Sequence, residues 1–237
     1  MQCHFSYALN LFEVDFRRRW NVTYYTDPFM PALFVGIYKH DVDVINQHQG
    51  FKILMFAGED IRNAVLLMPP YKVIATQVIA DELLKYNIKA DRILNIPFKS
   101  YSYYTPHMPG DKIYCYQNRD TVINRNKYVL ETLNDISEYF KGKVIAGYHP
   151  HTQGEMIDIY KQCYINLQLN PLAGFTSVLE MAHMGRPSLS NYPAPFCIPY
   201  KSTDDIISLI KNYKSFEYDV NAWLYHSDSW LDINFWQ

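Results

Sequence analysis

The stretch "YINLQLNPLAGFTSVLEMAHMGRPSLSN" (164–191) contains the clearest alternation of elements in the chain. Residues 164–170 are mostly apolar, and the run is short enough for a buried strand. A loop containing Gly174 follows, and then a helical pattern that ends at Gly185, shortly before Pro187. Residues 186–191 have the pattern of a new strand. A strand, a helix and a second strand in this order predict one unit of a parallel sheet.

The same alternation continues on both sides of this stretch. Upstream, apolar runs predict strands at 112–117 and 143–149, and helical periods predict helices at 126–140 and 154–163. Downstream, the pattern predicts a helix at 202–214, with Ser202 and Asp205 as its capping box. We therefore expect residues 101–215 to form one Rossmann-like domain.

Residues 1–100 are expected to form a second Rossmann-like domain with its own strands and helices. Apolar runs predict strands at 31–38, 51–60, 71–77 and 92–98. Helices are expected at 41–49, with Asp41 as N-cap, and at 78–88.

Two further segments connect and complete these domains. Residues 99–112 are polar, aromatic and rich in Pro and Gly, so they are expected to be a linker. Residues 216–237 carry several Trp and are expected to form a terminal helix that packs back on the first domain. The predicted fold class is α/β, with two Rossmann-like domains and mainly parallel sheets.

Composition and charge exclude several classes of protein. The chain has 237 residues, of which 49% are hydrophobic and 19% charged, as expected for a globular rather than a disordered protein. The net charge of −2 lacks the basic excess of a protein that binds nucleic acid through its phosphates. No run approaches the about 20 apolar residues of a membrane span, and the first residues lack the pattern of a signal peptide. We therefore expect a cytoplasmic protein.

The loop and helix start at 171–180 have the residue types of a nucleotide diphosphate site. Ligands of open α/β sheets bind beyond the carboxyl ends of the strands. Gly174 permits close approach of the backbone, and the N–H groups near Phe175 offer a seat for a phosphate. Thr176 and Ser177 add hydroxyl donors, and Glu180 can accept hydrogen bonds from a ribose. The alternative explanation is structural: Thr176 or Ser177 caps the helix, Glu180 complements its dipole, and Gly185 ends it.

The whole pattern resembles the GT-B glycosyltransferases, in particular the retaining, group-1-like members. In that family a strand leads to a Gly-Phe loop, then to "LEAMA-x-G-x-P" and another strand, and residues 164–191 are similar to this segment. The segments at 71–98 and 126–136 resemble the end of the N-terminal domain and the first helix of the C-terminal domain. Residues 34–61 also resemble a small virus-associated group of these enzymes. The resemblance implies two Rossmann-like domains that face each other across a cleft.

The resemblance also implies which residues contact the donor. Lys127 matches the Lys that contacts the donor pyrophosphate, and it would stabilise the leaving diphosphate together with Arg119 or Arg125. The family's partner Arg would fall on Thr121, so one of these two arginines must replace it. A second acidic residue of retaining members would fall on Leu172, so the chain lacks the carboxylate that normally shares the donor contacts there.

Further candidates follow other predicted strands. Asp60 is a candidate general base for the acceptor, although it also suits a cap of the next helix. His40 and Asp41 form a second candidate pair, for which capping by Asp41 is the preferred explanation. His149 and His151 would border the nucleotide base or the sugar, and Tyr148 would stack on the base.

The resemblance implies a hexosyl or pentosyl transferase that moves a sugar from a nucleotide diphosphate sugar to an acceptor hydroxyl. The acceptor would be held by the N-terminal domain; a glycan is preferred, and a modified DNA base is an alternative. We expect no metal and no cofactor besides the donor, because the paired acidic motif of the other large glycosyltransferase fold is absent. A viral member would act in the host cytoplasm. Two alternatives remain open: a sugar-nucleotide epimerase-like enzyme and a catalytically inactive nucleotide-sugar-binding module.

Overall fold

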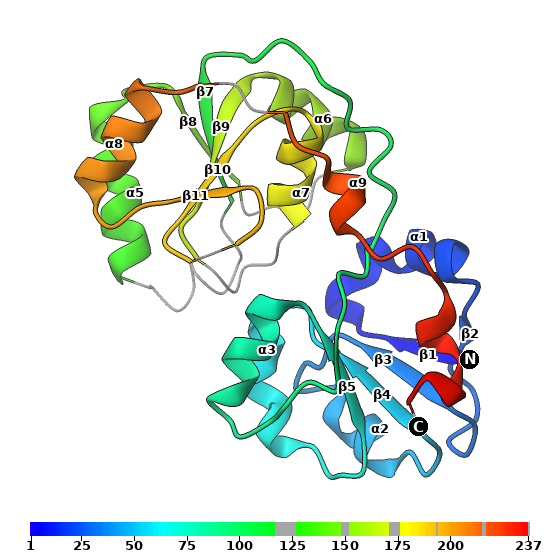
Figure 1. Ribbon diagram of the computed structural model, residues 1–237. Helices are drawn as coiled ribbons and strands as arrows, with labels where there is room; N and C mark the ends of the chain where they lie inside the picture. Colours follow the sequence, from blue (N-terminus) through cyan, green and yellow to red (C-terminus); the bar gives the residue numbers. More distant parts are fainter. Residues whose placement is uncertain (117–126, 148–151, 171–175, 193, 215–216, 237) are drawn as a thin grey trace. The chain divides into compact units, whose positions relative to one another are not determined.

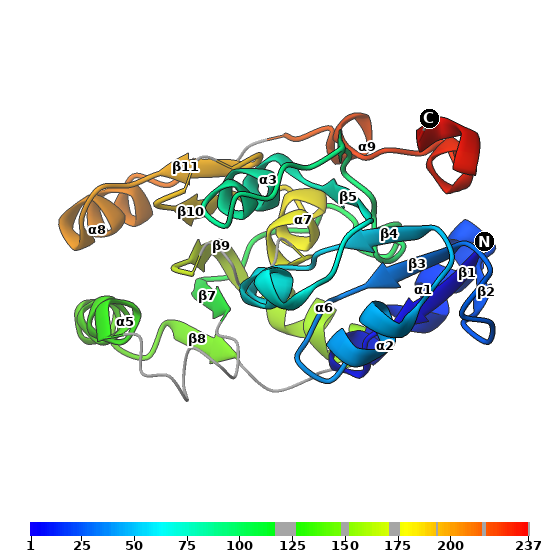
Figure 2. The ribbon, with the colours of Figure 1, turned by 90° about the horizontal axis from the view of Figure 1, so that it is seen from below.

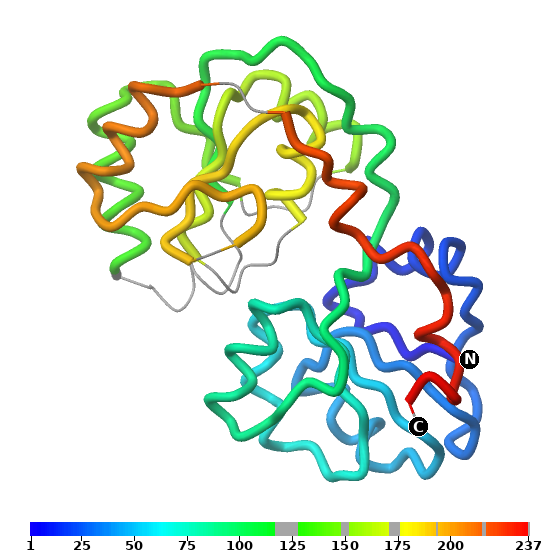
Figure 3. The backbone as a smooth tube through the Cα atoms, viewed as in Figure 1, coloured from blue at the N-terminus to red at the C-terminus, as the bar shows by residue number. Residues whose placement is uncertain are grey.

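The chain divides into two compact units, each built around one parallel sheet. The computed structural model describes residues 1–116, 127–147, 152–170, 176–192, 194–214 and 217–236. The first unit comprises Met1–Ser100 together with Asn221–Gln237, and the second comprises Tyr101–Val220. Both ends of the chain therefore belong to the first unit, as the tube in Figure 3 shows.

The sheet of the first unit has six strands in the order β2-β1-β3-β4-β5-β6, all parallel (Figure 1). The strands are β1 (Gln2–Phe5), β2 (Thr23–Tyr24), β3 (Ala32–Val35), β4 (Lys52–Met55), β5 (Lys72–Ala75) and β6 (Arg92–Ile93). All four residues of β3 and of β4 are buried. Such continuous burial is typical of parallel strands that are covered on both faces.

The connections of this sheet are mostly helical, as parallel pairing requires. They are η1 (Tyr7–Leu9), α1 (Asn10–Trp20), α2 (Val42–Gln47), η2 (Glu59–Leu66) and α3 (Gln77–Leu84). Gly36 ends β3 with a φ of +74°, and a Cβ there would lie 2.6 Å from a methyl group of Leu9. Glycine is therefore required at this turn, both for its backbone conformation and for its lack of a side chain.

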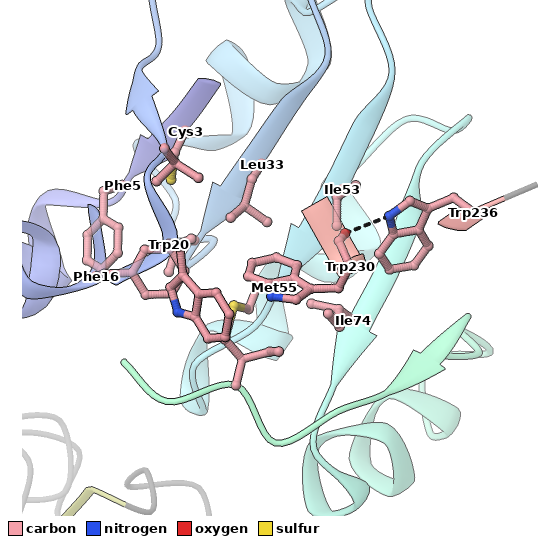
Figure 4. Close-up of a cluster of buried hydrophobic side chains, with 13 residues drawn as sticks. Cys3, Phe5, Phe16, Trp20, Leu33, Ile53, Met55, Ile74, Trp230 and Trp236 are labelled. Atoms are coloured by element: carbon pink, nitrogen blue, oxygen red, sulfur yellow. Dashed lines mark hydrogen bonds between the residues drawn. The ribbon is translucent and has the colours of Figure 1, made fainter. Parts of the chain in front are cut away.

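The C-terminal segment completes the core of the first unit. It consists of α9 (Val220–Trp223), η3 (Ser229–Leu231) and η4 (Ile233–Trp236). Trp230 is fully buried and packs edge-on against Trp20, with ring centroids 5.3 Å apart. Figure 4 shows Trp230 and Trp236 among buried side chains of the sheet, with the Trp236 Nε1–H donating to the Trp230 carbonyl at 2.9 Å.

The sheet of the second unit has five parallel strands in the order β11-β10-β9-β7-β8. They are β7 (Lys112–Tyr116), β8 (Val144–Gly147), β9 (Cys163–Gln168), β10 (Ser188–Ser190) and β11 (Cys197–Pro199). The helices are α5 (Lys127–Tyr139), α6 (Gln153–Lys161), α7 (Thr176–His183) and α8 (Thr203–Lys211). Helices α5 and α8 lie side by side (Figure 2) and cover a core that includes Ile113, Leu167 and Ile206.

The structure confirms the predicted fold class, an α/β protein with two parallel, Rossmann-like sheets. Strand β1, strand β2 and helix α1 were missing from the prediction, since no element was assigned before residue 31. The expected terminal helix is wrong, because Asp228–Trp236 contains only short 3-10 turns after the four-residue α9. At α8, Ser202 Oγ accepts from the Asp205 N–H, but the Asp205 carboxylate accepts from Lys201 instead of Ser202, so the capping box is half formed.

Candidate functional site

The strand order of the second sheet defines where a ligand is expected. Counted from β7, the next strand in the chain, β8, lies on one side, and the third, β9, lies on the other. The order in which the chain adds strands to the sheet thus reverses between β7 and β9. In open parallel sheets, ligands bind beyond the carboxyl ends of the strands at such a switch point.

The predicted donor residues follow the carboxyl ends of these three strands. Arg119, Arg125 and Lys127 come after β7, Tyr148 and His149 after β8, and Gly174 and Phe175 after β9. Lys127 is the first residue of α5, but its side chain is outside the described part of the structure. The other predicted residues of this group lie entirely outside the described part of the structure, and so does Leu172.

Helix α7 begins with two of the predicted hydroxyl residues. Thr176 is its first residue and is half-buried. Ser177 is 4% exposed, and its Oγ has no hydrogen-bond partner among the residues that the structure describes. A buried hydroxyl without a partner at a helix N-terminus is a group that a ligand oxygen could satisfy.

Glu180 lies one turn further along α7 and is 3% exposed. Its Oε1 accepts a hydrogen bond from the Tyr104 hydroxyl at 2.8 Å, and its Oε2 accepts one from the Tyr160 hydroxyl at 2.5 Å. Burial, reinforced by the nearby Glu180 carboxylate, raises the pKa of both phenols. The tyrosines therefore stay protonated and act as donors to the carboxylate.

The sequence contained no signal for these two tyrosines. Tyr104 belongs to the segment predicted as linker, and Tyr160 belongs to α6. They lie 76 and 20 residues from Glu180 in the chain. The predicted ribose contact of Glu180 is untested, but a ribose would share this carboxylate with two phenols.

Helix α7 ends at Gly185, as the structural explanation of this stretch predicted. Gly185 has a φ of +77°, and the N–H of Arg186 donates to the carbonyl of Met181, which is a Schellman-type stop. Arg186 is 1% exposed, and its guanidinium donates to the carbonyls of Cys163 at 2.6 Å and Met184 at 2.9 Å. These bonds join the end of α7 to the start of β9.

Asp60 lies at the carboxyl end of the first sheet, as predicted, but it is only 1% exposed. Its carboxylate accepts from the backbone N–H groups of Ile37 at 2.8 Å, Ala57 at 3.0 Å and Gly58 at 2.7 Å. Burial raises the pKa of Asp60, although these N–H groups oppose the shift. The carboxylate thus joins the loops after β3 and β4, and its role as general base stays a prediction.

Asp41 does not act as the predicted N-cap of α2. It precedes the helix, but its side chain makes no capping hydrogen bond. Its Oδ2 instead accepts from the Ser6 hydroxyl at 2.6 Å, and its Oδ1 lies 2.8 Å from His4 Nε2. His40 Nε2 lies 3.2 Å from Ser6 Oγ. The structure thus brings His40 and Asp41 together with His4 and Ser6, two residues that sequence reasoning missed.

Comparisons with known proteins identify no family. No protein-family model matches the sequence, and no curated protein gives a significant match. Within the described residues, every helix falls short of the length and apolarity that crossing a bilayer would require.

Proposed function

We propose that this protein is a glycosyltransferase of the GT-B type, which moves a hexosyl or pentosyl group from a nucleotide diphosphate sugar to an acceptor hydroxyl. In this proposal the second unit binds the donor, and the first unit binds the acceptor. The acceptor is a glycan hydroxyl, with a modified DNA base as the alternative.

The observation that carries the proposal is the strand order β8-β7-β9 in the second sheet. Because these strands are parallel neighbours, the chain segments that follow them leave from the same edge of the sheet. All the candidates for donor binding occur in those segments or at the start of the helices that follow them. This edge of the sheet, at a switch point, is where Rossmann-like sheets bind nucleotides, which supports the proposal.

The chemistry of transfer assigns a role to each group. The bond between the anomeric carbon and the diphosphate breaks, and negative charge grows on the leaving group. Lys127, with Arg119 or Arg125, would neutralise this charge. The N–H groups at the start of α7 and the hydroxyl of Ser177 would bind the phosphate oxygens, since a helix N-terminus attracts anions.

A panel of donors tests the proposal. The full-length protein is heated with UDP-glucose, UDP-galactose, UDP-N-acetylglucosamine and GDP-mannose in turn. At about 100-fold saturation a bound donor should add roughly 2.7 kcal/mol to the free energy of unfolding of the unit that binds it. Release of the nucleoside diphosphate is then measured, and Lys127→Ala should slow release more than it weakens binding.

The same panel separates the alternatives. An epimerase-like enzyme would convert the donor to an isomer without any acceptor, whereas an inactive module would bind a donor and never turn it over. Lack of stabilisation by every donor would contradict all three functions.

A further inference from the structure

Three loops at the amino edge of the first sheet form one continuous surface. They are residues 25–31, 46–51 and 65–71, and they precede β3, β4 and β5, which are neighbours in the sheet (Figure 1). The amino ends of parallel strands share one edge, opposite to the edge at which such sheets bind their ligands. Any role of this surface is therefore separate from ligand binding at the carboxyl edge.

Hydrogen bonds join each of these loops to the next. Residues 49–50 donate both of their backbone N–H groups to the Pro28 carbonyl, at 2.8 Å and 3.0 Å. The Asn46 side chain donates to the Leu66 carbonyl at 3.0 Å and accepts from the Met68 N–H at 2.8 Å. Because the first loop is fixed to the second and the second to the third, the surface that they form is preorganised.

The surface exposes four large apolar side chains. Phe29, Met30, Leu66 and Met68 are between 47% and 72% exposed, and we call these four residues the amino-edge patch. The first two precede β3 and the last two precede β5, so they form two apolar groups, one on each side of the loop before β4. Exposed apolar patches mark interaction sites, and aromatic and Met side chains are enriched in the cores of protein interfaces.

The charges around the patch differ between its two ends. Asp27, next to Phe29, is the only charged side chain in the three loops, all of which the structure describes. At the other end, Lys72 and Arg92 begin β5 and β6, and Asp91 lies 3.0 Å from the Lys72 ammonium, so positive charges exceed negative ones there. A surface with an apolar group at each end and opposite charges beside them is complementary to itself.

We propose that the amino-edge patch is the interface through which two copies of this chain form a symmetric dimer. In a two-fold pair the same surface of both copies meets, and every contact occurs twice. A two-fold axis through the loop before β4 brings the Phe29 group of one copy onto the Met68 group of the other. The same rotation brings Asp27 of each copy toward Lys72 of the other.

The size and charge of the surface favour a second copy over a membrane. The three loops comprise about 20 residues, and a standard interface uses roughly 20–30 residues from each protein. Anionic membranes attract Lys and Arg, and neither residue type occurs in these three described loops. The dimer also leaves the carboxyl edge of each first sheet free for a ligand.

Sedimentation velocity of the full-length protein tests the dimer. Between about 1 and 100 µM we expect a concentration-dependent species of twice the 28.0 kDa chain mass. Phe29→Glu and Met68→Glu place an unpaired charge in the interface, so each should raise the Kd of the dimer about tenfold or more. Both positions are exposed, so the Tm of the variants should stay close to that of the wild type. Leu11→Glu, an equally exposed position at the start of α1, is the matched control and should leave the Kd unchanged.

Cross-linking tests the two-fold arrangement. Phe29→Cys and Met68→Cys introduce exposed thiols, whereas the four native cysteines are buried or half-buried. Under mild oxidation, an equal mixture of the two variants should form more disulfide-linked dimer than either variant alone, because position 29 of one copy meets position 68 of the other. The wild type measures the background from the native thiols.

Several outcomes would overturn the inference. They are a wild type that stays monomeric over the whole range, a dimer that neither Glu variant weakens, a dimer that Leu11→Glu dissociates, and single Cys variants that cross-link as well as their mixture. Co-sedimentation of the wild type with vesicles of phosphatidylcholine and phosphatidylglycerol, abolished by Met68→Glu, would identify a membrane as the occupant and would also overturn it. The donor panel tests the proposed function independently of all these results.

Discussion

Glu180, Asp60 and Asp41 are buried carboxylates whose hydrogen bonds hold distant parts of their own unit together. Glu180 joins α7 to Tyr104 and Tyr160, Asp60 joins two loops, and Asp41 joins a loop to β1. A buried carboxylate is stable only when such donors replace water. Each of these residues therefore stabilises the fold of its unit, whether or not it takes part in a reaction.

Replacing Glu180 should destabilise the second unit. Glu180→Ala leaves two buried phenol hydroxyls without their acceptor, and each loss costs about 1–3 kcal/mol. We therefore expect the free energy of unfolding to fall by about 2–6 kcal/mol in urea denaturation. Glu138→Ala, on an exposed part of α5, should change it by less than about 0.5 kcal/mol.

Glu180→Gln serves to separate stability from donor binding, because the amide keeps one acceptor oxygen. If Glu180 binds the ribose, calorimetry on the folded Gln variant should show weaker donor binding. Equal stability of Glu180→Ala and the wild type would contradict the structural role.

At the scale of elements, the loops that follow β3 and β4 are joined to each other. Asp60 lies in η2, just after β4, and accepts hydrogen bonds from N–H groups of both loops. The N–H of Gly36 also donates to the carbonyl of Met55, at 2.9 Å, which joins the ends of the same two strands. The loop after β4 thus stabilises the loop after β3, in which His40 lies.

Replacing Asp60 should loosen this edge. Asp60→Ala removes the acceptor of three backbone N–H groups, so we expect a loss of about 2–4 kcal/mol in the free energy of unfolding. Asp43→Ala, at an exposed position of α2, is the matched control and should be nearly neutral. Hydrogen exchange should also become faster in residues 36–41 of the Asp60 variant. Unchanged exchange there would rule out the proposed connection.

At the scale of the whole molecule, the first unit is completed by the last residues of the chain. Trp230 contacts Trp20 and Phe16 of α1, and Trp236 belongs to the same hydrophobic cluster. The two large side chains bury apolar area that the short strands of the sheet would otherwise leave exposed. The core of the first unit is therefore built from side chains of both the N-terminal and the C-terminal segments.

Trp230→Ala should destabilise the first unit and not the second. Loss of a fully buried Trp costs about 3–5 kcal/mol. Hydrogen exchange followed by mass spectrometry should show lower protection in β1, β3 and β4, with β7 and β9 unchanged. Trp223→Ala, a half-buried residue of α9, should have a smaller effect. Equal loss of protection in both sheets would contradict the assignment of the C-terminal segment to the first unit.

The local features of the fold were predictable because they depend on neighbouring residues. Apolar runs such as 31–38 and 164–170 located β3 and β9, and the Gly185 stop of α7 followed from glycine alone. Strand β1 escaped prediction because it has only four residues and no flanking Gly or Pro. Asp41 was predicted as an N-cap from its place before a helix, but its side-chain partners are His4 of β1 and Ser6, the residue that follows β1.

The amino-acid sequence by itself determined that the chain is an α/β protein with two series of parallel strands, because strand and helix periods are properties of contiguous residues. Only the tertiary structure decided that Tyr104 and Tyr160 donate to Glu180, that His4 and Ser6 meet Asp41, and that the last tryptophans enter the first core. These contacts join residues 20 or more positions apart. They depend on the order of strands in each sheet, which no local pattern specifies.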